Sequence, residues 1–297
     1  MNTPFILDGG MGRELNHSGA PFRQPEWSAL ALIEGPEFVR RAHDAFIAAG
    51  ADAITTNSYA VVPFHLGEER FRKDGRVLAD RAGRIAREAA AAAPRKVTVA
   101  GSLPPLFGSY RPDLFIEKEA QGIAETLIAG LSPHVDVWLA ETQGSIAEAA
   151  SLKKAISDDK RPFWVSFTLE DGDNAAPPKL RSHEPVEAAV RAARDWKAEA
   201  LLFNCSQPEV MAAAIDAASK ALGSNSGITL GVYANAFPPQ DEDAEANAGL
   251  SDIRADLDPP RYLKFVQDWL GHGAGIVGGC CGIGPEHIAE IKRALAI

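Results

Sequence analysis

Three cysteines are the residues in this sequence whose type and spacing point most directly to chemistry. Cys280 and Cys281 are adjacent, Cys205 lies far earlier, and the 297-residue chain contains no other cysteine. An odd number of cysteines that includes an adjacent pair is a poor framework for disulfides. In a reducing compartment, such thiols more often bind a metal or take part in catalysis. The alternative is that they are small buried apolar residues, as free cysteines often are.

Three thiols match the ligand set of a catalytic zinc site. Zinc binds thiolate sulfur at about 2.3 Å in tetrahedral geometry, so three protein ligands leave the fourth position for a reacting ligand. Three thiolates also give the site a net negative charge, which keeps a bound substrate thiolate nucleophilic toward an alkyl carbon. Three neutral histidines would instead favour the acidification of water. Gly278, Gly279 and Gly282 flank the adjacent cysteines and allow a tight backbone that points both at one ion.

The elements that must position these cysteines follow a repeated order of apolar strand, loop and amphipathic helix. Near-continuous apolar runs are typical of buried parallel strands, and Pro or Ser often opens the following helix. The predicted strands are Phe5–Asp8, Ala53–Thr56, Val97–Ala100, Val135–Ala140, Phe163–Thr168, Ala200–Asn204, Ile228–Tyr233 and Gly275–Val277. The predicted helices are Pro36–Ala49, Arg76–Ala93, Ile116–Leu131, Ser145–Ile156, Pro185–Trp196, Pro208–Leu222, Pro259–Leu270 and Pro285–Leu295. Eight alternations favour a (β/α)8 TIM barrel over the main competitor, a doubly wound sheet.

The loops of this predicted barrel are unequal in length. Links from helix to strand are short, whereas Gly9–Gly35, Gly101–Phe115 and Ala234–Asp258 are long links from strand to helix. Long loops are uncommon without a function, and all strand-to-helix loops of a barrel gather on its catalytic face. Cys205 follows the sixth strand, and the adjacent pair follows the eighth. We therefore expect all three thiols at that face of a single domain covering residues 1–297.

Composition and charge exclude several other classes of protein. Apolar residues make up 46% of the chain, which is ordinary for a globular domain, and the net charge is −10. An acidic protein repels phosphate backbones, so we expect no nucleic-acid partner. No apolar run approaches the roughly 20 residues that span a bilayer, and the N-terminus lacks the features of a signal peptide. We expect no membrane partner and a cytoplasmic location.

Several short motifs together resemble the homocysteine S-methyltransferase family over nearly the whole chain. The Asn-Cys and Gly-Gly-Cys-Cys-Gly elements, in this order and spacing, are the most specific. The motifs are Asp8-Gly9-Gly10-Met11-Gly12-Arg13-Glu14-Leu15, Thr55-Thr56-Asn57-Ser58-Tyr59, Glu141-Thr142, Asn204-Cys205 and Gly278-Gly279-Cys280-Cys281-Gly282. The resemblance implies a barrel in which Cys205, Cys280 and Cys281 bind zinc, which in turn binds the thiolate of homocysteine.

The resemblance also implies a site for the amino-acid end of homocysteine. Backbone N–H groups around Gly9, Gly10 and Met11 would meet its carboxylate, and Asp8 and Glu141 would meet its ammonium. Both acids follow predicted strands on the catalytic face, and a zwitterion needs a carboxylate and oriented donors. Taken alone, Asp8 is equally well explained as a turn residue and Glu141 as an acid favoured at a helix N-terminus.

Two asparagines close predicted strands on the same face. Asn57 lies in Thr-Asn-Ser-Tyr and Asn235 in Tyr-Ala-Asn-Ala. Each amide is suited either to orienting a group in the site or to satisfying the backbone of its loop.

The methyl donor expected from the resemblance is a sulfonium compound, S-methylmethionine or S-adenosylmethionine. Relatives in this family also use betaine or a methylated cobalamin, but no segment for a cobalamin or folate domain accompanies the predicted barrel. The chain also ends just after the eighth helix, without the extension of betaine-using relatives. Betaine or another onium donor, or a different thiol acceptor, is the alternative within the same fold.

A sulfonium methyl is already activated, so the site mainly has to orient it in a dry environment. Aromatic faces suit the cationic sulfur, although loop packing is the better explanation for each of these side chains taken alone. The candidates on strand-to-helix loops are Trp27, Tyr59, Phe107 and Tyr110. The proline-rich segment Gly101–Arg111 departs from the commonest sulfonium-using pattern. The segment Asp241–Glu245 is strongly acidic, which is also typical of a solvated surface.

Two other functions compete with methyl transfer. A water-activating zinc hydrolase would want histidine or carboxylate ligands, and the seven histidines show no metal-ligand spacing. His183 lies in a strand-to-helix loop and is the histidine considered for the site. A zinc or thiol redox sensor without turnover is the alternative from a different class, because adjacent thiols can oxidise and release a metal.

Overall fold

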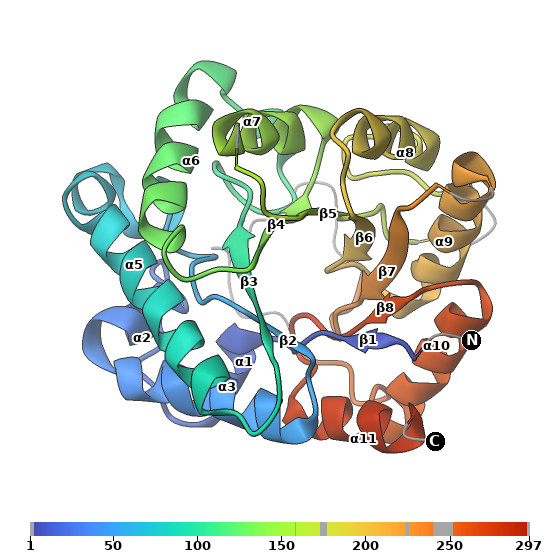
Figure 1. Cartoon of the computed structure of the whole chain (residues 1–297), viewed down its shortest axis with the longest axis horizontal. Coiled ribbons are helices and arrows are strands. Elements are labelled where there is room, and N and C mark those ends of the chain that lie inside the picture. Colours follow the sequence, from blue (N-terminus) through green and yellow to red (C-terminus); the bar gives the residue numbers. More distant parts are fainter. Residues whose placement is uncertain (1–2, 158, 173–176, 224–225, 240–251, 296–297) are drawn as a thin grey trace.

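The strands of this protein form a ring that the helices surround (Figure 1). The computed structural model describes residues 3–157, 159–172, 177–223, 226–239 and 252–295. All the strand pairs are parallel, and the order in the sheet is β1-β8-β7-β6-β5-β4-β3-β2. The strands are β1 (Phe5–Ile6), β2 (Ala53–Thr55), β3 (Thr98–Leu103), β4 (Val137–Gln143), β5 (Phe163–Phe167), β6 (Ala200–Asn204), β7 (Thr229–Tyr233) and β8 (Ile276–Val277). This order is that of a (β/α)8 barrel, so the predicted fold is confirmed and the doubly wound sheet is excluded.

Helices follow the strands and cover the outside of the ring. The helices predicted from the sequence are all present, as α3 (Pro36–Ala49), α5 (Glu68–Ala92), α6 (Glu117–Leu131), α7 (Ile146–Ile156), α8 (Val186–Asp195), α9 (Pro208–Leu222), α10 (Pro259–Gly271) and α11 (Pro285–Leu295). Their amphipathic faces explain this position, because each must bury one apolar stripe. The longest of them, α5, places Phe71, Leu78 and Ala82 on its buried side.

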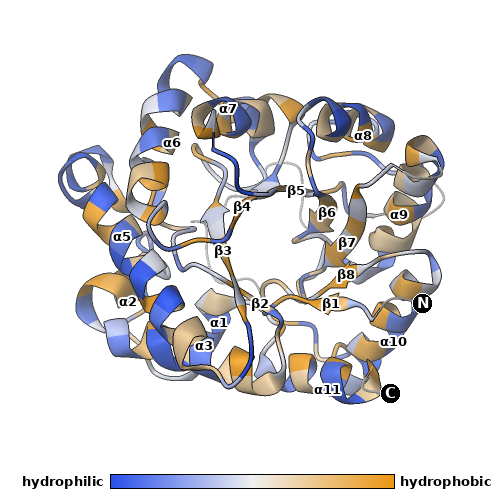
Figure 2. Cartoon of the chain, viewed as in Figure 1, coloured by the Kyte–Doolittle hydropathy of each residue, from blue (hydrophilic) through white to orange (hydrophobic). Residues whose placement is uncertain are grey.

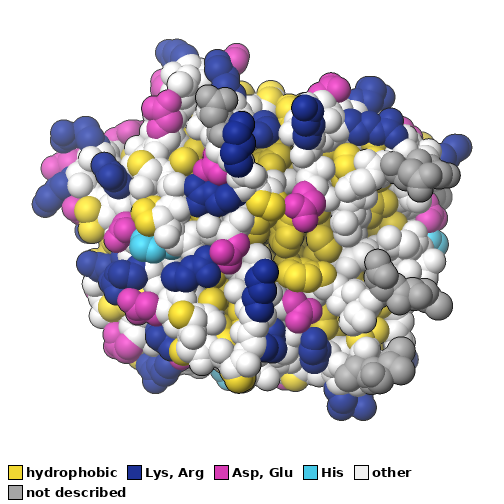
Figure 3. All heavy atoms as spheres, in the orientation of Figure 1, with side chains coloured by type: hydrophobic (Ala, Val, Ile, Leu, Met, Phe, Trp, Pro, Cys, Tyr) yellow, Lys and Arg dark blue, Asp and Glu magenta, His cyan; other side chains and the backbone are white. Residues whose placement is uncertain are grey.

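The hydrophobic core has two parts, one inside the ring and one between strands and helices. Leu139, Trp164 and Leu202 fill the inside, and a larger cluster joins the outward strand residues to the helices. Figure 2 shows β1 and β8 as hydrophobic and the helices as mixed. In the same orientation, Figure 3 shows charged side chains over the surrounding helices and hydrophobic ones near the centre. The filled interior makes the barrel a rigid support rather than a pore.

Short helices lie in loops for which the sequence predicted no regular structure. They are α1 (Met11–His17), α2 (Ala29–Glu34), α4 (Pro63–Leu66) and the single turn η1 (Pro112–Leu114). Helices this short are marginal alone and depend on tertiary packing, so their local patterns are weak. Helix α5 also begins eight residues before the predicted Arg76, because Gly75 interrupts the sequence pattern but is buried against Phe71.

The ring closes between β1 and β2 through side chains as well as backbone. The Asp52 N–H donates to the Ile6 carbonyl at 2.6 Å, and the Ile6 N–H donates to the Asp52 carboxylate at 3.0 Å. One strand end further along, the Thr55 N–H donates to Asp8 Oδ2 at 2.7 Å. Two carboxylates therefore complete the seam where the strand ladder is interrupted.

No helix in the described part of the chain is long and apolar enough to cross a membrane. The acidic segment Asp241–Glu245, singled out in the sequence, lies outside the described residues.

Candidate active site

One cavity opens where the carboxyl ends of the strands meet. Its enclosed volume is about 150 Å³. The loops after β1, β2, β3, β6, β7 and β8 contribute to its wall, together with the end of β4. The predicted site residues that line it are Asp8, Gly9, Gly10, Met11, Asn57, Glu141, Cys205, Cys280 and Cys281. Residues far apart in the sequence are thus brought together on the face predicted to be catalytic.

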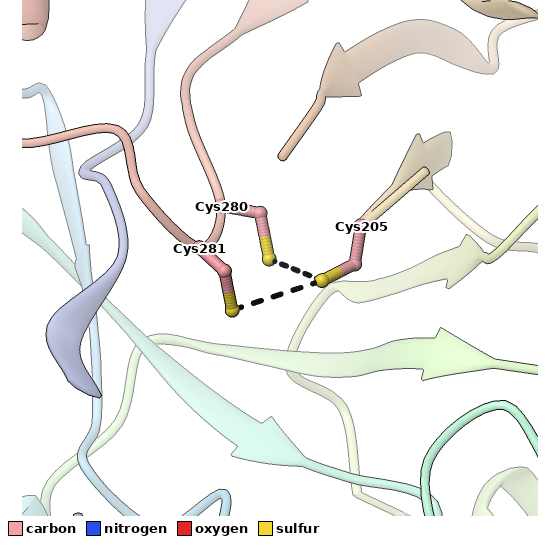
Figure 4. A group of neighbouring side chains, drawn as sticks. All are labelled: Cys205, Cys280 and Cys281. Carbon is pink, nitrogen blue, oxygen red and sulfur yellow. Dashed lines mark hydrogen bonds between the residues drawn. The ribbon is translucent and has the colours of Figure 1, made fainter. Parts of the chain in front are cut away.

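The three cysteine side chains point toward one another in this cavity (Figure 4). Cys205 Sγ lies 2.9 Å from Cys280 Sγ and 3.9 Å from Cys281 Sγ, and all three sulfurs lie within 4.8 Å of one another. Two sulfurs bound to one tetrahedral zinc ion at about 2.3 Å lie about 3.8 Å apart. The cluster therefore has the size and the soft donor atoms of a zinc site.

The backbone around the cysteines explains how they converge. Cys205 directly follows β6 and has a φ of +53°, a left-handed conformation that turns its side chain away from the strand direction. Cys280 and Cys281 follow β8, where a Cβ on Gly279 would lie 2.2 Å from Ile283 Cγ2. Only glycine fits at that position, so the loop folds back tightly enough for both thiols to face the cavity.

The thiols do not ionise alike. Hydrogen bonds from Cys205 and Cys280 hold the pKa of Cys281 well below its ordinary value. Pairing with Cys205 and Cys281, together with burial, raises the pKa of Cys280 well above it. A bound cation would favour the thiolate form of all three.

Two buried carboxylates, Asp8 and Glu141, form an acidic wall of the cavity. Burial raises the pKa of Asp8 to about 7, against the hydrogen bonds from Thr55 that lower it. Burial also raises the pKa of Glu141 to about 8; the Ser102 hydroxyl, which donates to this carboxylate, lowers it, and the nearby charge of Asp8 raises it further. A cationic ligand between the two would relieve both costs, so this wall is suited to an ammonium group.

The other residues singled out in the sequence divide between the cavity and its surroundings. Trp27, Tyr59 and Tyr110 line the cavity, and the Tyr110 hydroxyl lies 2.9 Å from Cys205 Sγ. Phe107 does not line it and packs edge-on against Phe115 instead. His183 is also outside the cavity, where its ring pairs with Glu170.

The two asparagines differ in position. Asn57 lines the cavity while its amide donates to the Ser28 carbonyl at 3.0 Å. Asn235 is buried outside the lining, and its amide oxygen accepts from the Phe237 N–H at 3.2 Å. Asn57 is therefore placed both to orient a group in the cavity and to satisfy the backbone of a loop. The amide of Asn235 contacts the backbone of its own loop.

Several lining residues were given no role from the sequence. Among them are Arg13, His65, Tyr233 and Phe237. The Arg13 guanidinium lies 5.5 Å from the centre of the Phe237 ring. Its positive charge lowers the pKa of Cys281, but less than the hydrogen bonds from the two other thiols do, and burial opposes this effect. Tyr233 ends β7 and Phe237 follows it, so the rule that strand ends carry the site was available for both. Arg13 lies in α1, within a motif quoted from the sequence, and His65 lies in α4, which had no such signal.

Comparisons with known proteins agree with this site. The model of the family described as Homocysteine S-methyltransferase matches residues 5–295. Homocysteine S-methyltransferase 4 of Zea mays is 28% identical over 98% of this chain and 89% of its own length. Selenocysteine methyltransferase of Astragalus bisulcatus is 26% identical over 98% of this chain and 92% of its own length.

A solved structure extends the likeness to three dimensions. The metallated form of the homocysteine methyltransferase MmuM from Escherichia coli is 26% identical, with a TM-score of 0.78 over 99% of this chain and 96% of its own. With the barrel, the three-cysteine cluster and a family model that spans almost all its residues, this chain belongs to the homocysteine S-methyltransferase family.

Proposed function

We propose that this protein is a zinc-dependent methyltransferase that moves a methyl group from a sulfonium donor to the thiol of homocysteine, giving methionine. The convergence of Cys205, Cys280 and Cys281 carries the proposal, because three thiols at one end of a cavity suit a metal with an open ligand position. When bound there, zinc would hold the acceptor thiol in its nucleophilic thiolate form.

The amino-acid end of homocysteine is assigned to the acidic wall of the cavity. Asp8 and Glu141 would receive its ammonium, and the backbone around Gly9, Gly10 and Met11 would lie beside its carboxylate. The Gly10 N–H itself donates to the Ile283 carbonyl at 2.9 Å, so the donors would be its neighbours. Each Asp8 oxygen accepts one hydrogen bond from Thr55, at 2.7 and 2.9 Å. A carboxylate has about four acceptor positions, so this role at the β1–β2 seam leaves capacity for a ligand.

The proposal favours a small donor. The cavity has a volume of about 150 Å³ and must also hold homocysteine, so a compact donor suits it better than one that carries a nucleoside. S-methylmethionine is therefore expected ahead of S-adenosylmethionine. In the proposed step, the acceptor sulfur forms a bond to the methyl carbon as the donor C–S bond breaks, and the donor leaves as a neutral thioether. Trp27, Tyr59 and Tyr110 offer ring faces for the cationic sulfur.

The proposal is tested first in the variant Cys280→Ser. A hydroxyl is a poor zinc ligand, so the variant should lose bound zinc and homocysteine methylation while its far-ultraviolet circular dichroism stays that of the wild type. Zinc is measured by elemental analysis and methylation by the appearance of methionine. Wild-type zinc content in the variant would refute the three-cysteine site.

A donor screen then separates the remaining functions. Homocysteine is incubated with S-methylmethionine, S-adenosylmethionine or betaine, and selenocysteine is tested as a second acceptor because of the relative from Astragalus bisulcatus. Fastest transfer from S-methylmethionine is expected. Turnover only with betaine would overturn the sulfonium assignment, and bound zinc without any turnover would favour a redox sensor.

A further inference from the structure

Strand β4 contains an irregularity at the residues that reach the cavity. Ala140 pairs with Val165 on β5, and the next pair is Gln143 with Phe167. Three steps along β4 thus correspond to two along β5, which leaves one extra residue in β4. Such a bulge redirects side chains at the end of a strand. Here it contains Glu141 and Thr142, both of which line the cavity.

The bulge places Thr142 in an unfavourable backbone conformation. Its φ is +57°, in the left-handed region that β-branched residues rarely occupy. A residue in this region persists only where its surroundings hold it there. Thr142 is also buried, with 1% of its surface exposed, so contacts with neighbouring side chains must supply that hold.

The side chain of Asn204 supplies it from two strands away. Its Oδ1 accepts from the Thr142 N–H at 2.9 Å, and its Nδ2 donates to Thr142 Oγ1 at 2.8 Å. Between them, Ser166 on β5 donates to the same Oδ1 at 2.6 Å. Asn204 is fully buried. Only an amide offers an adjacent acceptor and donor in this geometry, so the residue type matches the task.

Asn204 therefore connects the sulfur cluster with the acidic wall, and its Nδ2 also donates to Cys280 Sγ at 4.0 Å. It directly precedes Cys205 of the sulfur cluster, and Thr142 directly follows Glu141 of the acidic wall. The Gln143 side chain adds a second hold by donating to the Glu141 carbonyl at 2.8 Å. A change at the Asn204 contact would move the acidic wall relative to the sulfur cluster.

We propose that Asn204 is a positioning residue that holds the β4 bulge and thereby sets the distance between the thiol end and the ammonium end of the acceptor site. This inference rests on the proposed function for its substrate. Its consequence is selectivity for acceptor length, because cysteine has one methylene fewer than homocysteine and cannot span the same distance. A single methylene is typically worth about 10- to 200-fold in discrimination.

The test combines Asn204→Ala with a rescue. In Asn204→Ala, Thr142 should leave the left-handed region, and KM for homocysteine should rise about tenfold or more. The preference for homocysteine over cysteine in kcat/KM should fall by a similar factor. Adding Thr142→Gly should restore much of the KM and of the acceptor preference, because glycine adopts positive φ without the hydrogen bonds from Asn204. Thr142→Gly alone sets the baseline for the lost side chain.

A matched control removes a different contact of the same amide. Ser166→Ala deletes one partner of Asn204 Oδ1 but leaves both bonds to Thr142, so it should change KM much less than Asn204→Ala. Zinc content is measured in every variant. If Asn204→Ala loses zinc and Thr142→Gly does not restore it, Asn204 acts on the cysteine ligands at the end of β6 and the proposal is overturned.

Crystal structures of wild type and Asn204→Ala separate this inference from the proposed function. If no donor methylates homocysteine in the wild type, the proposed function is wrong. The φ of Thr142 in the two structures still tests whether Asn204 holds the β4 bulge. If Thr142 stays left-handed in Asn204→Ala and the acceptor preference is unchanged, Asn204 does not hold the β4 bulge. This result would overturn the inference whether or not the proposed function is correct.

Discussion

At the scale of single residues, Glu141 combines burial with a position on the cavity wall. Only 8% of its surface is exposed, and its carboxylate lies near that of Asp8. We expect Glu141→Gln to raise Kd for homocysteine by about 10- to 100-fold, because it removes the charge that meets the ammonium; a hydrogen bond to a charged group is worth roughly 1.5–3 kcal/mol. Titration calorimetry measures Kd, and the zinc content should not change. An unchanged Kd would contradict the assignment of Glu141.

The same two acids predict how acceptor binding depends on pH. Burial raises the pKa of Asp8 to about 7 and that of Glu141 to about 8, so both carry protons at mildly acidic pH. An ammonium ligand binds the ionised acids, and protons compete with it as the pH falls through these values. Affinity for homocysteine should therefore fall between about pH 8 and pH 6, by up to tenfold per pH unit for each acid that must ionise.

The control for this pH profile is an acceptor without an amino group. 4-Mercaptobutanoic acid shares the thiol and carboxylate of homocysteine, so metal and thiol titrations affect both compounds alike. The ratio of the two dissociation constants isolates the ammonium contribution. If this ratio is constant from pH 6 to pH 8, the two acids do not receive the ammonium.

At the scale of elements, the seam between β1 and β2 depends on Asp52. Asp136 makes the equivalent contact between β3 and β4, where the Val99 N–H donates to its carboxylate at 2.8 Å. The strands beside Asp136 continue as a ladder from Ala100 to Leu103, whereas β1 and β2 have no such ladder. The two aspartates thus make the same kind of hydrogen bond, but only the strands beside Asp136 are also held by a backbone ladder.

We expect Asp52→Ala to lower the free energy of unfolding by roughly 1–3 kcal/mol, the cost of leaving the buried Ile6 N–H without a partner. Asp136→Ala should cost less, because the β3–β4 ladder holds its strands in place. Chemical denaturation of both variants measures the difference. Equal losses would mean that the seam does not depend on the carboxylate more than an ordinary strand pair does.

At the scale of the whole molecule, a metal in the cysteine cluster would tie β6 to the loop after β8, across β7. A ligand that binds only the folded state stabilises it by about 2.7 kcal/mol at 100 times its Kd. We therefore expect chelation to lower Tm by on the order of 5 °C. Scanning calorimetry with zinc or with a chelator measures the shift. A variant with serine at positions 205, 280 and 281 should not respond, and an equal response there would place the metal elsewhere.

Prediction from sequence succeeded where local pattern and position in the fold coincide. Buried parallel strands are recognisable as apolar runs, and their ends carry the site, so Cys205 and Cys280 were placed correctly. The same rule does not say which of several residues in a loop faces the cavity. Asn235 was chosen after β7, but Phe237 lines the cavity and Asn235 bonds to its backbone.

The sequence by itself determined the order of strands and helices and the donor atoms at the strand ends, because periodicity and residue type are local properties. Tertiary structure decided the distances among the sulfurs and the burial that raises the pKa values of Asp8 and Glu141. It also decided the contact of Asn204 with Thr142, residues 62 positions apart. These properties arise only when the barrel closes, since closure brings distant strand ends within hydrogen-bonding range and excludes water from between them.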